Sequence, residues 1–132
     1  MSSSILKRRQ TLGSHEWIKS KKLSQELFEE GPSFFLYPFI VRFLEKELPE
    51  KTNLQVMVAV PKKKVKSAAK RNLIKRRVRE AYRTQKRQLQ DWLDSENKEM
   101  LVSLVYIAKE PQEYFFIQEK IDEILKEIPN KF

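Results

Sequence analysis

The sequence predicts an α/β (α+β) two-layer sandwich in which helices pack against a single β-sheet. Segments with apolar residues at helical spacing alternate with short runs of β-branched and aromatic residues, in the order helix, two or three strands, helix, strand, helix. Each helical segment carries one apolar stripe, so the stripes must be buried against a shared sheet. A length of 132 residues suits one domain. We expect this domain over residues 16–132, after a flexible tail over residues 1–15.

The first elements are a helix and an aromatic strand region. Residues 16–30 carry a rough apolar stripe and predict a helix that ends at Gly31-Pro32. Residues 33–44 are rich in aromatic and β-branched side chains, which favour a strand. Pro38 has no amide hydrogen, so strand pairing is expected to begin after it, or else this strand lies at a sheet edge.

The remaining elements alternate strand and helix. Residues 54–60 predict a half-buried or buried strand, because valine and leucine recur at every second position. A long helix is expected over residues 68–93 and a further strand over residues 100–107. The last helix begins near Pro111, and Pro129 is expected to end it.

Positive charge is concentrated in one part of the chain. The net charge is +9, yet residues 61–90 contain thirteen lysines and arginines against a single acid, Glu80. The local net charge is therefore +12, and the rest of the chain carries −3. A slightly acidic body with one strongly basic element is typical of proteins that bind a nucleic acid or an anionic membrane.

The helix predicted over residues 68–93 separates apolar and basic side chains onto two adjacent faces. At about 100° per residue, the apolar arc docks the helix on the sheet and leaves the basic arc to solvent. The basic arc contains Arg71, Lys75, Arg76, Arg79, Arg83, Lys86 and Arg87, with Asn72 in its middle. Several of these bases repel one another at i, i+4 spacing, which indicates that phosphates neutralise them in a complex. The preceding segment PKKKVKSAAK extends this anion-binding surface with five further lysines.

No constellation of catalytic side chains is evident. The chain has no cysteine, and its one histidine, His15, falls in the expected tail. Its two glycines, Gly13 and Gly31, cannot form a glycine-rich phosphate loop. We therefore expect no catalytic residue and no metal ligand on this protein. No apolar run approaches the roughly 20 residues that span a membrane.

A polar motif in the basic helix resembles the signature of the protein subunit of bacterial ribonuclease P. The motif is Arg71-Asn72-x-x-Lys75-Arg76-x-x-Arg79-Glu80-x-x-Arg83. It follows a strand and a lysine-rich loop and precedes the strand LVYIAKE, which is similar to the order in that family. Upstream, LFEEG followed by an aromatic strand also matches, so the resemblance covers about residues 16–128.

This resemblance implies a cytoplasmic role in removing the 5′ leader from precursor tRNA, as one subunit of an endoribonuclease. The family's phosphodiester chemistry belongs to a large catalytic RNA with bound magnesium, and the protein binds that RNA and the leader. Neither a membrane nor DNA is expected as a partner. The fold that the resemblance implies has a left-handed strand–helix–strand crossover, whereas general rules favour a right-handed one.

The resemblance also assigns binding residues. The expected contacts with the catalytic RNA are Lys63, Lys64, Arg71, Asn72, Lys75, Arg76, Arg79 and Arg83. The expected leader cleft contains Phe28, Ile40 and Arg42, with a core position as the alternative for Phe28. The family often has an aromatic residue where Arg42 stands, so this cleft is expected to use less stacking and more charge. Lys66 stands where the family commonly has glycine, so the loop turn is expected to differ.

Other classes of polyanion-binding protein stay open on composition alone. A structural RNA-binding protein, such as a ribosomal one, has the same charge pattern, and only the motif and its context favour the ribonuclease P resemblance. Leucine-zipper basic regions lack a sheet and continue into heptads. A membrane-surface helix exposes a bulky apolar face, which here is more simply explained as core.

Overall fold

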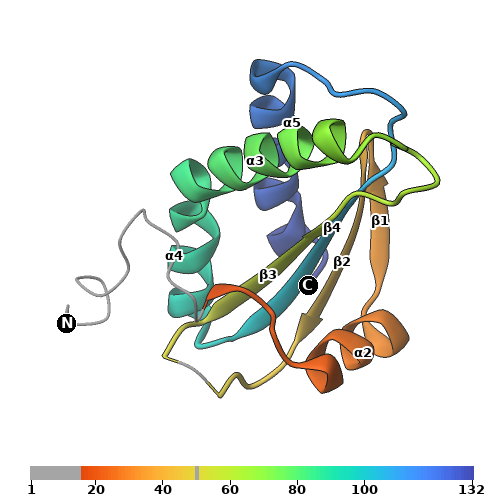
Figure 1. Cartoon of the computed structure of the whole chain (residues 1–132). Coiled ribbons are helices and arrows are strands. Elements are labelled where there is room, and N and C mark those ends of the chain that lie inside the picture. Colours follow the sequence, from red (N-terminus) through yellow and green to blue (C-terminus); the bar gives the residue numbers. More distant parts are fainter. Residues whose placement is uncertain (1–15, 50) are drawn as a thin grey trace.

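The computed structural model of the chain describes residues 16–49 and 51–132, and the tail predicted over residues 1–15 lies outside them. The elements, in chain order, are α2 (Lys21–Glu30), β1 (Ser33–Leu36), β2 (Phe39–Glu45), β3 (Leu54–Ala59), α3 (Ala68–Gln85), α4 (Arg87–Glu96), β4 (Met100–Tyr106) and α5 (Tyr114–Asn130). One face of the sheet is covered by α3, α4 and α5, and α2 packs on part of the other face (Figure 1). The predicted α+β class is confirmed.

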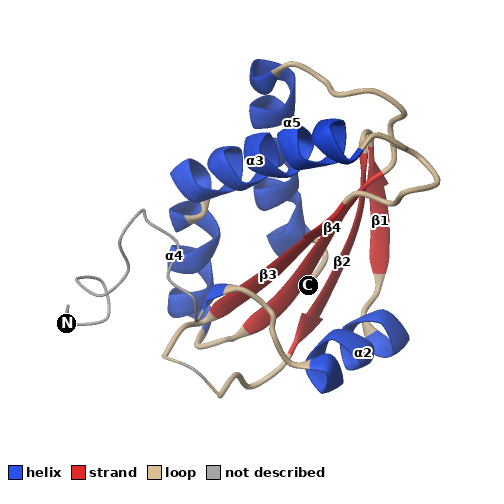
Figure 2. Ribbon diagram, viewed as in Figure 1, coloured by secondary structure: helices blue, strands red, loops and turns tan. Residues whose placement is uncertain are grey.

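The four strands form one mixed sheet in the order β1-β2-β4-β3 (Figure 2). The β1–β2 and β2–β4 pairs are antiparallel, and β3 is parallel to β4. Parallel neighbours need a crossover connection, which α3 and α4 supply; the left hand expected for it stays a prediction. Because β3 and β4 end at the same edge of the sheet, the loop before α3 and the connection before α5 meet there.

The first helix begins later than the sequence predicted. The Ser20 hydroxyl accepts a hydrogen bond from the third amide of the following turn at 3.2 Å and caps α2 at its start. Residues 17–20 are not helical. Trp17 forms a parallel bridge with Val56, and the Ile18 amide donates to the Val56 carbonyl at 3.1 Å. Pairing with the outer edge of β3 therefore replaces the helical turn expected here.

The long helix predicted over residues 68–93 is two helices. α3 ends at Gln85, α4 starts at Arg87, and the chain changes direction at Lys86 between them (Figure 1). The Lys86 side chain points into the protein, where it is 2% exposed and its ammonium lies 2.7 Å from a Glu16 carboxylate oxygen. The break between α3 and α4 thus buries Lys86, which the sequence pattern had placed on the exposed basic arc.

Pro38 divides the aromatic strand region into a hairpin: the edge-strand alternative is correct for β1, but pairing does not begin only after Pro38, because Ser33–Leu36 already pair with β2. Pairing of β2 begins at Phe39, the residue after Pro38. β1, the part before the turn, is one of the two edge strands of the sheet.

Gly31 ends α2 at a point where the chain approaches β2 closely. A Cβ atom at this position would lie 2.6 Å from the Leu27 carbonyl oxygen and 2.8 Å from that of Phe43. Both contacts are with backbone, which cannot rotate away, so glycine is required here by space.

Apolar side chains form a cluster on each face of the sheet. The larger one joins the inward residues of the strands to the apolar stripe of α5, which is Ile117, Ile121, Ile124, Leu125 and Ile128. The smaller one lies under α2 and is made by Leu23, Leu27, Leu48 and Leu101. Burial of each such side chain contributes about 1.5–3 kcal/mol, which fixes α2 and α3 to opposite faces. No helix in the described ranges is long and apolar enough to cross a membrane.

Candidate nucleic-acid interface

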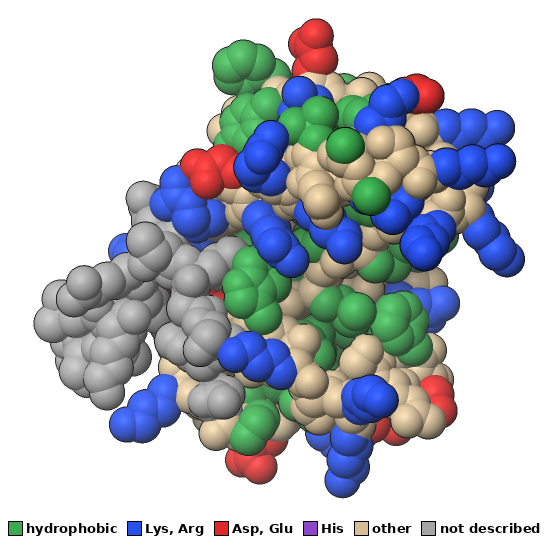
Figure 3. Space-filling view, in the orientation of Figure 1, with side chains coloured by type: hydrophobic (Ala, Val, Ile, Leu, Met, Phe, Trp, Pro, Cys, Tyr) green, Lys and Arg blue, Asp and Glu red, His purple; other side chains and the backbone are tan. Residues whose placement is uncertain are grey.

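α3 carries the basic motif on the side that faces away from the sheet. Its buried residues are Ile74, Val78, Ala81 and Tyr82. The Ser67 hydroxyl caps the helix by accepting a hydrogen bond from the Lys70 amide at 3.2 Å. Lysine and arginine side chains gather over α3 and the loop before it (Figure 3). The two-faced helix predicted from the sequence is confirmed as far as the end of α3.

We define the strip as Arg71, Asn72, Lys75, Arg76, Arg79 and Arg83. The structure brings these six predicted residues together, and five of them line a shallow hollow with Glu80. Arg71 also has a structural role, because its guanidinium donates to the carbonyls of Val65 and Lys66 at 2.9 Å each and ties the loop to the helix. Arg83 pairs with Glu80 at 2.6 Å. This hydrogen bond holds the pKa of Glu80 below its ordinary value, so the pair stays charged at neutral pH.

The basic side chains of the strip that are most available to bind a ligand are Lys75, Arg76 and Arg79. Within residues 16–49 and 51–132, none of these three forms an ion pair. Arg79 lies over the indole of Trp17, with 5.0 Å from its Cζ to the ring centroid. Three like charges on one helix face repel one another, and phosphate oxygens are the ligands that relieve this repulsion.

The loop before α3 adds a group of lysines at the N-terminal end of the strip. The amides of Lys64 and Val65 donate to the Pro61 carbonyl at 3.0 and 3.1 Å, which closes the turn and buries the Val65 side chain. A shallow pocket here is lined by Lys63, Lys64, Lys66, Lys70 and Lys109, with Glu110 at its rim. Sequence reasoning missed Lys109, because only the parallel pairing of β3 with β4 brings its loop here.

The residues predicted for the leader cleft lie together on the sheet face that α2 partly covers. Phe28 in α2 is 41% exposed, so the core alternative for this side chain is wrong. The Arg42 guanidinium carbon lies 5.6 Å from the centroid of the Phe28 ring. Ile40 shares this face with Arg42, since the residues between and around them in β2 are buried on the other side.

We call Phe28, Phe35, Ile40 and Arg42 the leader surface. Phe35 is directly opposite Ile40 in the β1–β2 register and is 61% exposed. Sequence reasoning missed Phe35, because the hairpin register decides which face it takes. The leader surface therefore has two exposed aromatic rings and one guanidinium.

Lys86 and Arg87, predicted on the basic arc, do not continue the strip. The buried ion pair removes Lys86 from the surface, and Arg87 belongs to α4, whose direction differs from that of α3 (Figure 1). Nor does any group of three histidine, aspartate or glutamate side chains in the described part of the chain have an arrangement that could hold a metal ion.

A cationic helix face backed by a sheet, with a lysine-rich loop at its start, defines the class of nucleic-acid-binding α+β proteins. Comparison with known proteins gives the family: the model described as Ribonuclease P matches residues 12–128, and the chain belongs to this family. It therefore binds the ribonuclease P RNA, is part of an endoribonuclease holoenzyme and acts in the processing of tRNA 5′ leaders.

Individual relatives agree with this assignment. The chain is 36% identical over 93 residues to the ribonuclease P protein component of Chlorobium phaeobacteroides, a match that covers 68% of this chain and 64% of the relative. It is 29% identical over 99 residues to that of Porphyromonas gingivalis, covering 75% and 72%. A solved structure of the Staphylococcus aureus RNase P protein has a similar fold, with a TM-score of 0.67 at 21% identity over 84% of this chain and 93% of that one.

Proposed function

We propose that the protein holds two RNA segments at once. The strip and the loop lysines bind the catalytic RNA, and the leader surface binds the 5′ leader of precursor tRNA. The observation that carries the first part is a trio of bases, Lys75, Arg76 and Arg79, that have no carboxylate partner among the described residues and lie on a helix whose opposite face is buried. Their mutual repulsion is a cost in the free protein that bound phosphates remove.

The leader surface has the chemistry that single-stranded RNA requires. Such strands bind where aromatic side chains stack on bases and nearby cations hold the backbone. Phe28 and Phe35 supply exposed rings, and Arg42 supplies a guanidinium beside the first of them. The family often has an aromatic residue where Arg42 stands, so a guanidinium at this position shifts the balance from stacking toward charge.

The hydrolysis of the phosphodiester bond is assigned to the RNA subunit, with magnesium bound mainly by that RNA. The protein's side chains support this division of labour. Among the described residues, Glu80 is the carboxylate that lines the hollow of the strip. Arg83 forms an ion pair with it, so Glu80 is poorly placed to act as a base or a metal ligand. We place the process in the cytoplasm, where the family's substrate is made.

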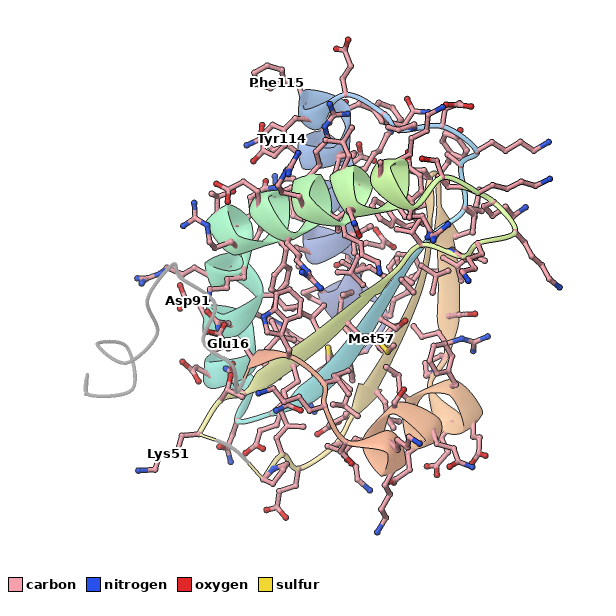
Figure 4. The ribbon with its side chains drawn as sticks, viewed as in Figure 1. Glu16, Lys51, Met57, Asp91, Tyr114 and Phe115 are labelled. Atoms are coloured by element: carbon pink, nitrogen blue, oxygen red, sulfur yellow. The ribbon has the colours of Figure 1, made fainter. Side chains whose placement is uncertain are left out.

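Reconstitution tests the proposal. The protein is mixed with its cognate ribonuclease P RNA and precursor tRNA at a magnesium concentration at which the RNA alone is slow. We expect leader cleavage that needs both components. Arg76→Ala should raise the protein concentration required for half-maximal cleavage. Lys51→Ala is the control, because it removes the same charge from an exposed side chain far from α3 (Figure 4).

Two results would contradict the proposal. Tight binding of the RNA without any stimulation of cleavage would indicate a structural RNA-binding protein. Equal effects of Arg76→Ala and Lys51→Ala would mean that charge in general, and not the strip, brings the RNA to the protein.

A further inference from the structure

The segment that leads into α2 behaves as a short extra strand on the outer edge of β3. Trp17 and Ile18 both contact Val56, through a parallel bridge and a backbone hydrogen bond of 3.1 Å. Their side chains take opposite faces, as in a strand. Trp17 packs on the cluster under α3, and Ile18 packs on the cluster under α2. The segment therefore places an indole between the edge of β3 and the strip.

The buried ion pair fixes the start of this segment. Glu16 and Lys86 are 7% and 2% exposed and meet at 2.7 Å, and Glu16 lies beside α4 (Figure 4). Two charges buried in contact tolerate little displacement, because each needs the other in place of water. The pair thus joins the residue before Trp17 to Lys86, the residue directly after α3.

Trp17 is half-buried and supports one member of the strip. The guanidinium carbon of Arg79 lies 5.0 Å from the centroid of the Trp17 indole. Arg79 is exposed, occupies the middle of the strip's arc and lines the hollow. Indole is the best aromatic partner for a cation, and a guanidinium that stacks on it keeps its N–H edges available. No aromatic contact is found for Lys75 or Arg76 in the described part of the chain.

We propose that Trp17 is a positioning residue of the RNA interface: its indole holds the Arg79 guanidinium in the orientation that receives a phosphate of the catalytic RNA. The inference rests on the proposed role of the strip. A long side chain that is ordered before binding loses less conformational freedom when it binds. Residues 16–18, with their anchor at Lys86, are then as much a part of the RNA site as α3.

A double-mutant cycle tests this inference. The affinity for ribonuclease P RNA is measured at one salt concentration for Trp17→Leu, Arg79→Ala and the double variant. Exposed cation–π contacts give about a two- to five-fold effect on an equilibrium constant. We expect Trp17→Leu to weaken binding by about that factor in the parent protein and to have no effect when Arg79 is alanine. Trp17→Phe should keep most of the affinity.

The possible outcomes distinguish a failure of the role inferred for Trp17 from a failure of the role proposed for the strip. If Arg79→Ala leaves RNA affinity unchanged, the strip assignment fails and this inference fails with it. If Arg79→Ala weakens binding and Trp17→Leu does not, only the inference is overturned. An equal loss of RNA affinity from Trp17→Leu with and without Arg79 would also overturn it, because the indole would then affect binding by stabilising the fold and not by orienting Arg79.

Fluorescence keeps the inference testable if Trp17→Leu folds poorly. In a Trp92→Phe protein, the emission of Trp17 alone is followed as RNA is added. We expect a change in emission that disappears when Arg79 is replaced by alanine. Emission that RNA leaves unchanged would contradict a role for the indole beneath the bound phosphate.

Discussion

Replacement of Lys86 by alanine distinguishes a structural base from an RNA-binding one. The sequence pattern put Lys86 on the basic arc, but its ammonium is 2% exposed and lies 2.7 Å from the Glu16 carboxylate, itself 7% exposed. Removal of one partner from a buried pair costs about 3–5 kcal/mol, because the other charge stays buried. We expect Lys86→Ala to lower the free energy of unfolding by about this amount.

Urea unfolding followed by circular dichroism measures the effect. With a urea m-value of about 1–3 kcal/mol/M, a loss of about 3–5 kcal/mol should lower the midpoint by about 1–5 M. Lys51→Ala, which removes the same charge from an exposed position, should change stability by less than about 0.5 kcal/mol. The double variant Glu16→Leu/Lys86→Met should be more stable than Lys86→Ala, because it leaves neither charge buried alone.

RNA binding supplies the result that would refute this reasoning. At a temperature where Lys86→Ala is folded, the salt dependence of its RNA affinity should equal that of the parent protein, because Lys86 does not face the RNA. An unchanged unfolding midpoint with a weaker salt dependence would mean that Lys86 belongs to the strip.

Three further substitutions test other parts of the account. Phe28→Ala should weaken binding of a single-stranded leader RNA by about 1–3 kcal/mol, the value of one stacked base, as measured by fluorescence anisotropy. Gly31→Ala should destabilise the protein by about 1–3 kcal/mol in urea unfolding, because its Cβ atom overlaps fixed backbone. Burial raises the pKa of Tyr106 to about 12, above the unfolded value of about 10. Its contribution to stability is complete below pH ~10 and is lost as the pH rises toward ~12, so Tyr106→Phe should reduce this alkaline loss in unfolding experiments.

Each of these predictions has a matched control or a contradicting result. Phe115→Ala is the control for Phe28→Ala, since Phe115 is 77% exposed on α5 and projects away from the sheet (Figure 4); equal losses would contradict the leader surface. A stable Gly31→Ala protein would mean that α2 can shift away from β2. An identical alkaline profile for Tyr106→Phe would assign that loss of stability to other groups.

The two faces of α3 could be predicted from the sequence because the information is local. Helical spacing alone separates Ile74 and Val78 from Lys75 and Arg79, and no distant partner is needed to decide which face is buried. The same holds for the stop at Gly31. Helical spacing and the backbone chemistry of glycine are therefore enough to predict the strip and the end of α2 from the sequence alone.

The parts that sequence reasoning missed depend on contacts between distant segments. Lys86 fits the basic arc by its spacing, but it is buried in an ion pair with Glu16, which lies 70 positions earlier in the chain. Trp17 was assigned to a helix, because its real partner is the edge of β3. The face taken by Phe35 depends on the hairpin register with β2. In each case tertiary pairing overrides a correct local pattern.

The salt dependence of RNA binding by Arg76→Ala tests the central claim most directly. Affinity for the cognate ribonuclease P RNA is measured over a range of salt concentrations for the parent protein, Arg76→Ala and Lys51→Ala. Each lost phosphate contact should lower the slope of log K against log salt by about 0.7–0.9. We expect that decrease for Arg76→Ala, with an unchanged unfolding midpoint, and no decrease for Lys51→Ala. An unchanged slope for Arg76→Ala would contradict the assignment of the strip as the surface that binds the catalytic RNA.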